Sequence, residues 1–224
     1  LSRSHRKRVR TDSLFFLEKI MKTIQFCGDS FCASTVSTSY TVLLSEMLNA
    51  NMIGRGRAGS AHEHAIRTFD TSADYTVFCW TESQRLFLAD EEMDINLSTA
   101  MKYVEQTGVQ SHTKTIAKAA FAYFRYIGHK PMQTAYNKQR QMRDLYWFDH
   151  EVLSKSDSKI IHYFNKRVTY QFKHGYQMPG TIHDDFSIPS VEHNPHYYNH
   201  LSEENNKILA ETLYNKFTDP LLFT

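Results

Sequence analysis

The chain has few of the features that mark membrane proteins or disulfide-stabilised secreted domains. It contains no run of about 18 apolar residues, the length that a membrane-spanning helix needs, so we predict no membrane span. Its three cysteines, Cys27, Cys32 and Cys79, are odd in number and match neither a disulfide framework nor a zinc site. Two of them lie within apolar strand-like runs. We therefore predict buried, reduced thiols and a reducing compartment such as the cytoplasm.

The sequence also has little excess charge. Its 224 residues carry a formal net charge of +2, and much of the positive charge lies between Arg3 and Arg10. The remainder is close to neutral, so its overall charge does not argue for nucleic acid as a partner. There is no internal repeat and no low-complexity tract. With 41% apolar and 22% charged residues, the composition is that of an ordinary globular domain.

Residues 1–20 resemble the charged start of a secretory signal, but their apolar part, LFFLEKI, is too short and carries two charges. We favour a disordered basic arm. An upstream extension of a protein whose natural start is Met21 is compatible with it. A polybasic arm that docks on an acidic partner or nucleic acid is the less favoured reading. We treat residues 21–224 as one domain.

Strands and helices alternate in the first third of this domain. Apolar runs predict buried strands at 23–28, 51–56 and 75–80. Helical spacing predicts helices at 39–50 and 60–69, the second with Ser60 as a possible cap. This alternation predicts an α/β fold with a parallel sheet between two helical layers, a three-layer α/β/α arrangement of the flavodoxin-like kind.

The rest of the chain is more helical. Residues 85–155 predict an inserted helical layer with helices at 112–128 and 133–153, whose aromatic residues pack in a core or a helix–helix seam. A fourth strand follows at 159–164, a fifth or edge strand at 169–174, and a loop at 175–200. The last helix, 202–217, has Ser202 near its cap and residues 208, 209 and 213 on its buried face.

Polar motifs follow the predicted strands at their carboxyl ends, where open parallel sheets bind ligands. Gly28-Asp29-Ser30 follows the first strand, Gly56-Arg57-Ala58-Gly59 the second, and Thr81-Glu82-Ser83-Gln84-Arg85 the third. A serine on a sharp turn exposes its hydroxyl beside backbone N–H groups that can stabilise an oxyanion. It needs a general base to act as a nucleophile. Ser30 is thus either a nucleophile or simply a cap.

The ordered set of blocks, GDSF, then GRGRAGS, then the motif after the third strand, then His200-Leu201-Ser202, resembles the SGNH (GDSL-like) hydrolase family. The resemblance covers about two-thirds of the chain and implies a three-layer fold with a serine esterase activity. It implies Ser30 as nucleophile and oxyanion donor, Gly56 as a second donor, and His200 as the base. Because the chain is compact and has a helical insertion, it also resembles SGNH-type proteins encoded by tailed phages.

Two positions depart from the family pattern. Glu82 stands where the family has an asparagine that donates to the oxyanion, and an ionised carboxylate only accepts hydrogen bonds. Gln84 or Arg85 are our candidates for the replacement donor. Tyr197 stands where the family has an acid three residues before the histidine. Glu192, Asp184, Asp185 or a backbone carbonyl are candidates for orienting the imidazole.

A histidine-rich loop suggests a rival chemistry. His183, His193, His196 and His200 lie there with Asp184 and Asp185, and such side chains suit zinc. Because the loop has no helical frame, we favour a polar cleft lining and predict no metal and no cofactor. His62 and His64 are predicted on different helix faces, at the surface.

Three functions follow from these residues. The favoured one is hydrolysis of an acetyl or other small acyl ester, including one carried by a carbohydrate. The alternative is an impaired SGNH-fold structural or binding protein, for example a virion component that forms homo-oligomers and acts in a virion or host cytoplasm. The third is a metal-dependent hydrolase built on the loop. We expect residues 21–224 to bind neither a membrane nor a nucleic acid.

Overall fold

The structure is a computed structural model, and it describes residues 21–88, 93–127, 131–165, 170–185 and 201–223. Strands occupy the following ranges: β1 Lys22–Gly28, β2 Ala50–Gly54, β3 Tyr75–Trp80, β4 Leu86–Leu88, β5 Met93–Ile95, β6 Lys159–Phe164 and β7 Tyr176–Thr181. Helices occupy the following ranges: η1 Ser30–Cys32, α1 Tyr40–Met47, α2 His62–Thr68, α3 Leu97–Glu105, α4 Ser111–Ile127, α5 Pro131–Glu151, η2 Leu153–Lys155, α6 Ile182–Asp185 and α7 Glu203–Thr218.

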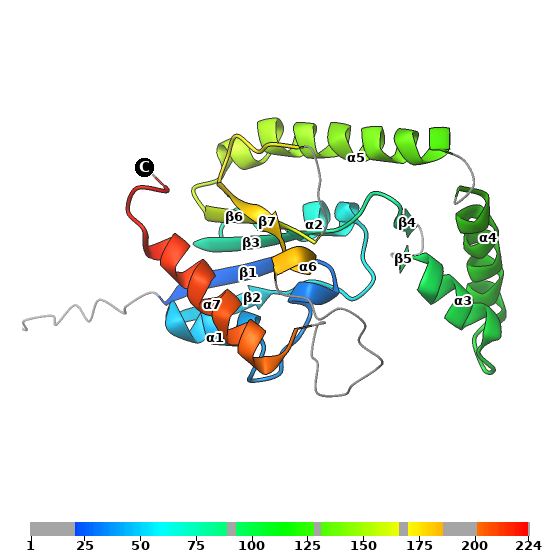
Figure 1. Cartoon of the computed structure of the whole chain (residues 1–224), viewed down its shortest axis with the longest axis horizontal. Helices are drawn as coiled ribbons and strands as arrows, with labels where there is room; N and C mark the ends of the chain where they lie inside the picture. The colour runs from blue at the N-terminus through cyan, green and yellow to red at the C-terminus, as the bar shows by residue number, and fades with distance from the viewer. Residues whose placement is uncertain (1–20, 89–92, 128–130, 166–169, 186–200, 224) are drawn as a thin grey trace, which may run out of the picture.

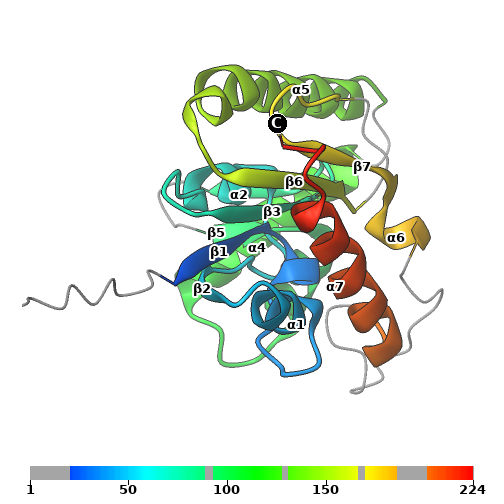
Figure 2. The ribbon, with the colours of Figure 1, turned by 90° about the vertical axis from the view of Figure 1, so that its left-hand side faces the viewer.

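Five parallel strands form the central sheet in the order β2-β1-β3-β6-β7. Helices α1 and α7 cover one face, and α2 and α5 cover the other (Figures 1 and 2). The predicted α/β architecture with a parallel sheet between two helical layers is confirmed. Among the described residues, no helix is both long enough and apolar enough to cross a membrane.

Alternation along the strands creates a separate core on each face, because successive side chains of a strand point to opposite sides. In β3, Val77 and Cys79 belong to the core under α1 and α7, whereas Phe78 and Trp80 belong to the core under α2 and α5. All three cysteines are buried and free, as expected.

The fifth strand is not where the sequence pattern placed it. The prediction of a strand at 169–174 and a loop from 175 is wrong, since β7 is formed by Tyr176–Thr181. Pro179 is tolerated there because β7 is at the edge of the sheet. Tyr170 and Phe172 are buried instead in the core under α5, where the Tyr170 hydroxyl donates to Asp149 at 2.9 Å.

Two details of the helix ends also differ from expectation. Ala61, not Ser60, is the N-cap of α2, and the Ser60 hydroxyl donates to the carbonyl oxygen of Gly28 at 2.8 Å. Ser202 caps α7 as predicted, accepting from the Asn205 N–H at 3.1 Å. On α7, Leu209 and Leu213 are buried, whereas Ile208 is exposed.

The segment between β3 and β6 contains more than one unit. The predicted helices at 112–128 and 133–153 are present as α4 and α5, and a β4–β5 hairpin and α3 precede them. Helix α5 covers the sheet, whereas α3 and α4 lie to one side in Figure 1 and share a small core of their own. The view of residues 85–155 as an insertion stays a prediction.

Candidate functional site

The turn that carries Ser30 is held by hydrogen bonds at both ends. The carbonyl oxygen of Gly28 accepts from the Arg57 N–H at 2.9 Å and from the Ser60 hydroxyl at 2.8 Å. One carboxylate oxygen of Asp29 accepts from the Phe31 N–H at 3.1 Å and caps η1. Ser30 is the first residue of η1 and is only half-buried.

Asp29 is the centre of a buried polar network. Its second carboxylate oxygen accepts from Asn165 Nδ2 at 2.8 Å and forms an ion pair with Arg85 Nη2 at 3.2 Å. The Asp29 side chain is completely buried and that of Arg85 nearly so. These contacts connect the turn below Ser30 to Arg85 and to the end of β6, although Arg85 Nε and Asn165 Oδ1 are buried without a hydrogen-bond partner.

Gly56 packs directly against this turn. A Cβ added at Gly56 would overlap with Cys32 Sγ and with the carbonyl oxygens of Asp29 and Gly28, so only glycine fits. The second motif is therefore adjacent to the first, as the family resemblance implies. However, the Gly56 N–H donates to the carbonyl oxygen of Cys32 at 2.9 Å. Its role as an oxyanion donor stays a prediction.

The motif after β3 supplies structural contacts. Arg85 donates to the carbonyl oxygen of Ser60 at 3.0 Å in addition to its ion pair with Asp29. Gln84 is exposed, and Glu82 is half-buried. The guanidinium of Arg85 thus serves to connect the first three motifs, and the proposal that Gln84 or Arg85 replaces the family asparagine stays untested.

Asn165 is a residue of this edge that the sequence analysis missed. It follows β6 immediately and is buried, and its Nδ2 also lies 3.3 Å from Thr81 Oγ1. Its position at the carboxyl end of a predicted strand was a usable signal. The site therefore draws residues from the ends of β1, β2, β3 and β6.

The loop that follows α6 was the source of the predicted base. His200, Glu192, His193, His196 and Tyr197 lie outside the described residues. The other two candidate acids are among the described residues. The Asp185 carboxylate accepts from the Tyr163 hydroxyl at 2.6 Å, and the Asp184 backbone N–H donates to Thr181 Oγ1 at 3.1 Å. The histidine-loop metal site is not tested by these contacts.

Leu201, which follows His200, is the first described residue after this loop. Leu201 is completely buried in the same core as Phe31, the residue after Ser30. Asn206 fixes the start of α7, because its Nδ2 lies 3.3 Å from the Leu201 carbonyl oxygen and its Oδ1 accepts from the Tyr40 N–H at 2.9 Å. Leu201 and Phe31 thus both belong to the core under α1 and α7.

The thiols near this edge are not candidate nucleophiles. Burial raises the pKa of Cys27 to about 12 and also raises the pKa of Cys32. The Cys79 sulfur lies 3.0 Å from the Tyr40 hydroxyl in the same core. Because only the thiolate is strongly nucleophilic, the thiols of Cys27 and Cys32 are inert here.

Comparisons with known proteins are sparse. No family model and no curated protein matches the chain. Among solved structures, the chain is similar to an acetyl xylan esterase (Est2A) from the rumen bacterium Butyrivibrio proteoclasticus, with a TM-score of 0.43 and 11% sequence identity. That alignment covers 88% of this chain and 64% of the esterase chain. None of these comparisons supports a phage origin.

Proposed function

We propose that this protein is a serine esterase that hydrolyses a small acyl ester, of the acetyl type, with Ser30 as the nucleophile. The observation that carries the proposal is the position of Ser30. It is half-buried on a turn held by the contacts of Asp29 with Asn165 and Arg85, at the carboxyl edge of a parallel sheet. A serine on a backbone turn held in this way at the sheet edge is what nucleophilic catalysis needs.

The general base in this proposal is His200. Its support is its place in the sequence, directly before Leu201, which is buried in the core under α1 and α7. The Ser30 oxygen attacks the ester carbonyl carbon, and the imidazole accepts the hydroxyl proton. The imidazolium then gives that proton to the departing alcohol. Water activated by the same imidazole hydrolyses the acyl-serine and releases the carboxylic acid.

An impaired hydrolase that acts as a binding protein is the second candidate. The observation that favours it is the use of the expected oxyanion donors in structural contacts: the Gly56 N–H donates to Cys32, and Arg85 is paired with Asp29. Removing one oxyanion donor from a working enzyme costs about 100- to 1000-fold in rate. A protein with this arrangement would bind an ester without efficient turnover.

The deciding experiment compares p-nitrophenyl acetate hydrolysis and fluorophosphonate labelling in the wild type and in Ser30→Ala. Ser37→Ala is the matched control, because Ser37 is an exposed serine of the following loop. We expect the wild type and the control to be labelled and Ser30→Ala not to be. Loss of the base in His200→Ala should lower the rate by at least about 100-fold.

Equal hydrolysis by the wild type and Ser30→Ala would remove Ser30 as the nucleophile. Labelling of the wild type without measurable turnover would favour the impaired binding protein. A carbohydrate as the alcohol part is tested separately, by acetate release from an acetylated oligosaccharide with Ser30→Ala as the blank.

A further inference from the structure

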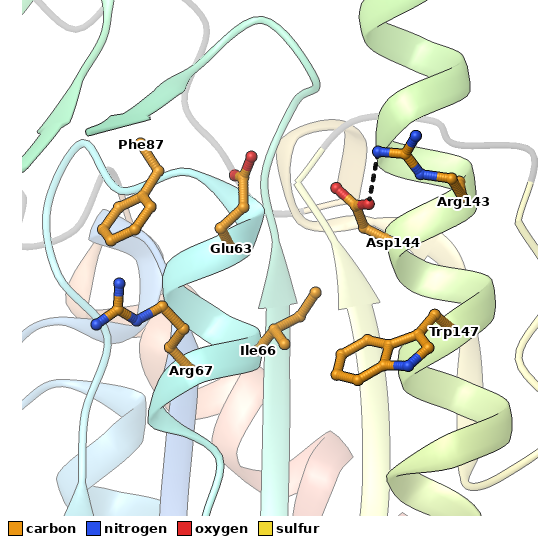
Figure 3. Close-up of a pocket in the computed structure, with 7 residues that line it drawn as sticks. All are labelled: Glu63, Ile66, Arg67, Phe87, Arg143, Asp144 and Trp147. Atoms are coloured by element: carbon orange, nitrogen blue, oxygen red, sulfur yellow. Dashed lines mark hydrogen bonds and ion pairs between the residues drawn. The ribbon is translucent and has the colours of Figure 1, made fainter. Parts of the chain in front are cut away.

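A cavity of about 670 Å³ lies between α2 and α5, on the face of the sheet that α7 does not cover. Figure 3 shows Glu63 on α2 and Asp144 on α5 on its two sides, with Ile66 and Trp147 farther along the same two helices. Apart from these acids and two arginines, the lining is apolar. The question is therefore why two carboxylates, Glu63 and Asp144, line a cavity that is otherwise largely apolar.

Behind these carboxylates lies His62, which the sequence analysis placed at the surface. That prediction is wrong, because the His62 side chain is completely buried. Its Nε2 is 3.0 Å from Asp144 Oδ2, and its Nδ1 is 3.2 Å from Glu63 Oε2. One potential ligand atom from each of the three side chains lies within 4.8 Å of the other two. That spacing suits a single bound ion.

Two of these atoms lack a hydrogen bond. Neither His62 Nδ1 nor Glu63 Oε2 has a hydrogen-bond partner, although both are buried and face each other. A buried polar atom without a partner costs about 1–3 kcal/mol. A cation bound by His62 Nδ1 and Glu63 Oε2 would satisfy both atoms.

The outer oxygens of the two carboxylates are held by arginines. Arg140 Nη2 lies 3.4 Å from Glu63 Oε1, and Arg143 Nη2 lies 3.4 Å from Asp144 Oδ1. Glu63 Oε2 and Asp144 Oδ2 are thus the oxygens that face His62. Carboxylates that bind a metal are commonly oriented in this way by groups that contact their other oxygen.

We propose that His62, Glu63 and Asp144 bind a divalent transition-metal ion, with Zn²⁺ as the model ion. One imidazole nitrogen and two carboxylate oxygens suit such an ion, and water from the cavity can complete its coordination. The ion would connect α2 to α5. Since Ser60, just before α2, donates to the Gly28 carbonyl, it would also stiffen the Ser30 turn. Binding of the ion does not require the proposed esterase activity, so each can fail without the other.

The test measures metal binding directly. Protein stripped with a chelator is dialysed against Zn²⁺, and Co²⁺ is used as a second probe through its visible absorption. We expect a bound Zn²⁺ that Glu63→Gln and Asp144→Asn each weaken by at least tenfold. Glu151→Gln is the matched control, because Glu151 is an exposed carboxylate on the same helix as Asp144. We expect it to bind like the wild type.

Other occupants of this position give different results. If the wild type binds no Zn²⁺, His62 is bridged to the carboxylates by protons alone, and the proposal is wrong. If both variants bind as tightly as the wild type, the ion belongs to another part of the chain, and the proposal is equally wrong. Circular dichroism first checks that each variant is folded. Asp144→Glu, which keeps the charge and displaces the carboxylate, replaces Asp144→Asn if that variant does not fold.

Discussion

The hydrogen bonds of His162 determine its protonation state. This histidine of β6 is completely buried, and its ring stacks on Phe172 with centroids 3.6 Å apart. Its Nδ1 accepts from Trp80 Nε1 at 3.0 Å, and its Nε2 is 2.8 Å from the carbonyl oxygen of His174. An indole N–H can only donate. His162 Nδ1 must therefore keep its lone pair, and the ring is neutral with its proton on Nε2.

We expect His162 to make the protein less stable in mild acid. Burial lowers the pKa of His162 from 6.5 to about 3. A lowered folded-state pKa gives stability that is complete above the unfolded value, here about 6.5, and that is lost as the pH falls towards the folded value. By linkage, His162 alone should reduce the free energy of unfolding by about 2 kcal/mol between pH 7 and pH 5.

His162→Gln is the variant that isolates this effect, because a glutamine amide can accept from Trp80 and donate to His174 without titrating. Urea unfolding at pH 7 and pH 5 measures both proteins. The wild type should lose about 2 kcal/mol more than the variant over this range. Identical losses would mean that His162 does not control the acid response.

Sequence patterns predict single residues well when the signal is local. The burial of Cys27 and the cap at Ser202 follow from neighbouring residues, and both are observed. The contacts of Asn165 and His62 depend on partners 136 and 82 positions away, namely Asp29 and Asp144. No periodicity within either segment contains that information. The contacts within the site network were therefore beyond sequence reasoning, although the positions of Ser30 and Asn165 at the ends of predicted strands were not.

Elements were predictable where hydrophobic periodicity was strong and less so at the sheet edge. The strands β1, β3 and β6 are apolar and central, and their ranges were predicted closely. At the edge, TYQFKH has better strand residues than YQMPGT, yet the second segment forms β7. Tertiary packing decides this, because Tyr170 and Phe172 fill the core below α5.

The end of β1 is an element boundary that only glycine fits. Gly28 has φ of +153°, and a Cβ there would overlap with the carbonyl oxygen of Cys79, its partner in β3. We expect Gly28→Ala to lower the free energy of unfolding by about 3 kcal/mol or more, because the backbones of two central strands must separate.

Gly108→Ala is the matched control for Gly28→Ala. Gly108 also has positive φ, +82°, but a Cβ there meets no atom within 4 Å. Only the backbone conformation should matter at this position, at a cost of about 1 kcal/mol. Thermal or urea unfolding measures both variants. Similar losses in the two would show that close strand packing at Gly28 contributes little.

At the scale of the whole molecule, the described residues form two large cores and a third, smaller one. The cores on the two faces of the sheet contain most of the large buried side chains, including Trp80, Phe78 and Tyr163. The third core joins α3 and α4 to the β4–β5 hairpin, and three of its five buried members are alanines. Asp94 of β5 anchors the hairpin by pairing with Arg57 and accepting from the Ala61 N–H at 2.7 Å.

We expect the α3–α4 unit to open without unfolding of the sheet. Buried apolar area stabilises by roughly 25 cal/mol per Å². The fully buried members of the third core are mostly alanines and its larger members, such as Tyr103 and Phe121, are only partly buried, so it contributes less than either core of the sheet. Regions with few buried contacts exchange their amide hydrogens through local opening at a lower free energy than the global one. Hydrogen exchange with mass spectrometry should therefore show peptides of α3 and α4 exchanging faster than those of β1 and β3.

Phe124→Ala, which removes a large member of the third core, should speed exchange in α3 and α4 and leave exchange in β3 unchanged. Equal protection of α4 and β3 in the wild type would instead mean that α3, α4 and the sheet unfold together as one cooperative unit.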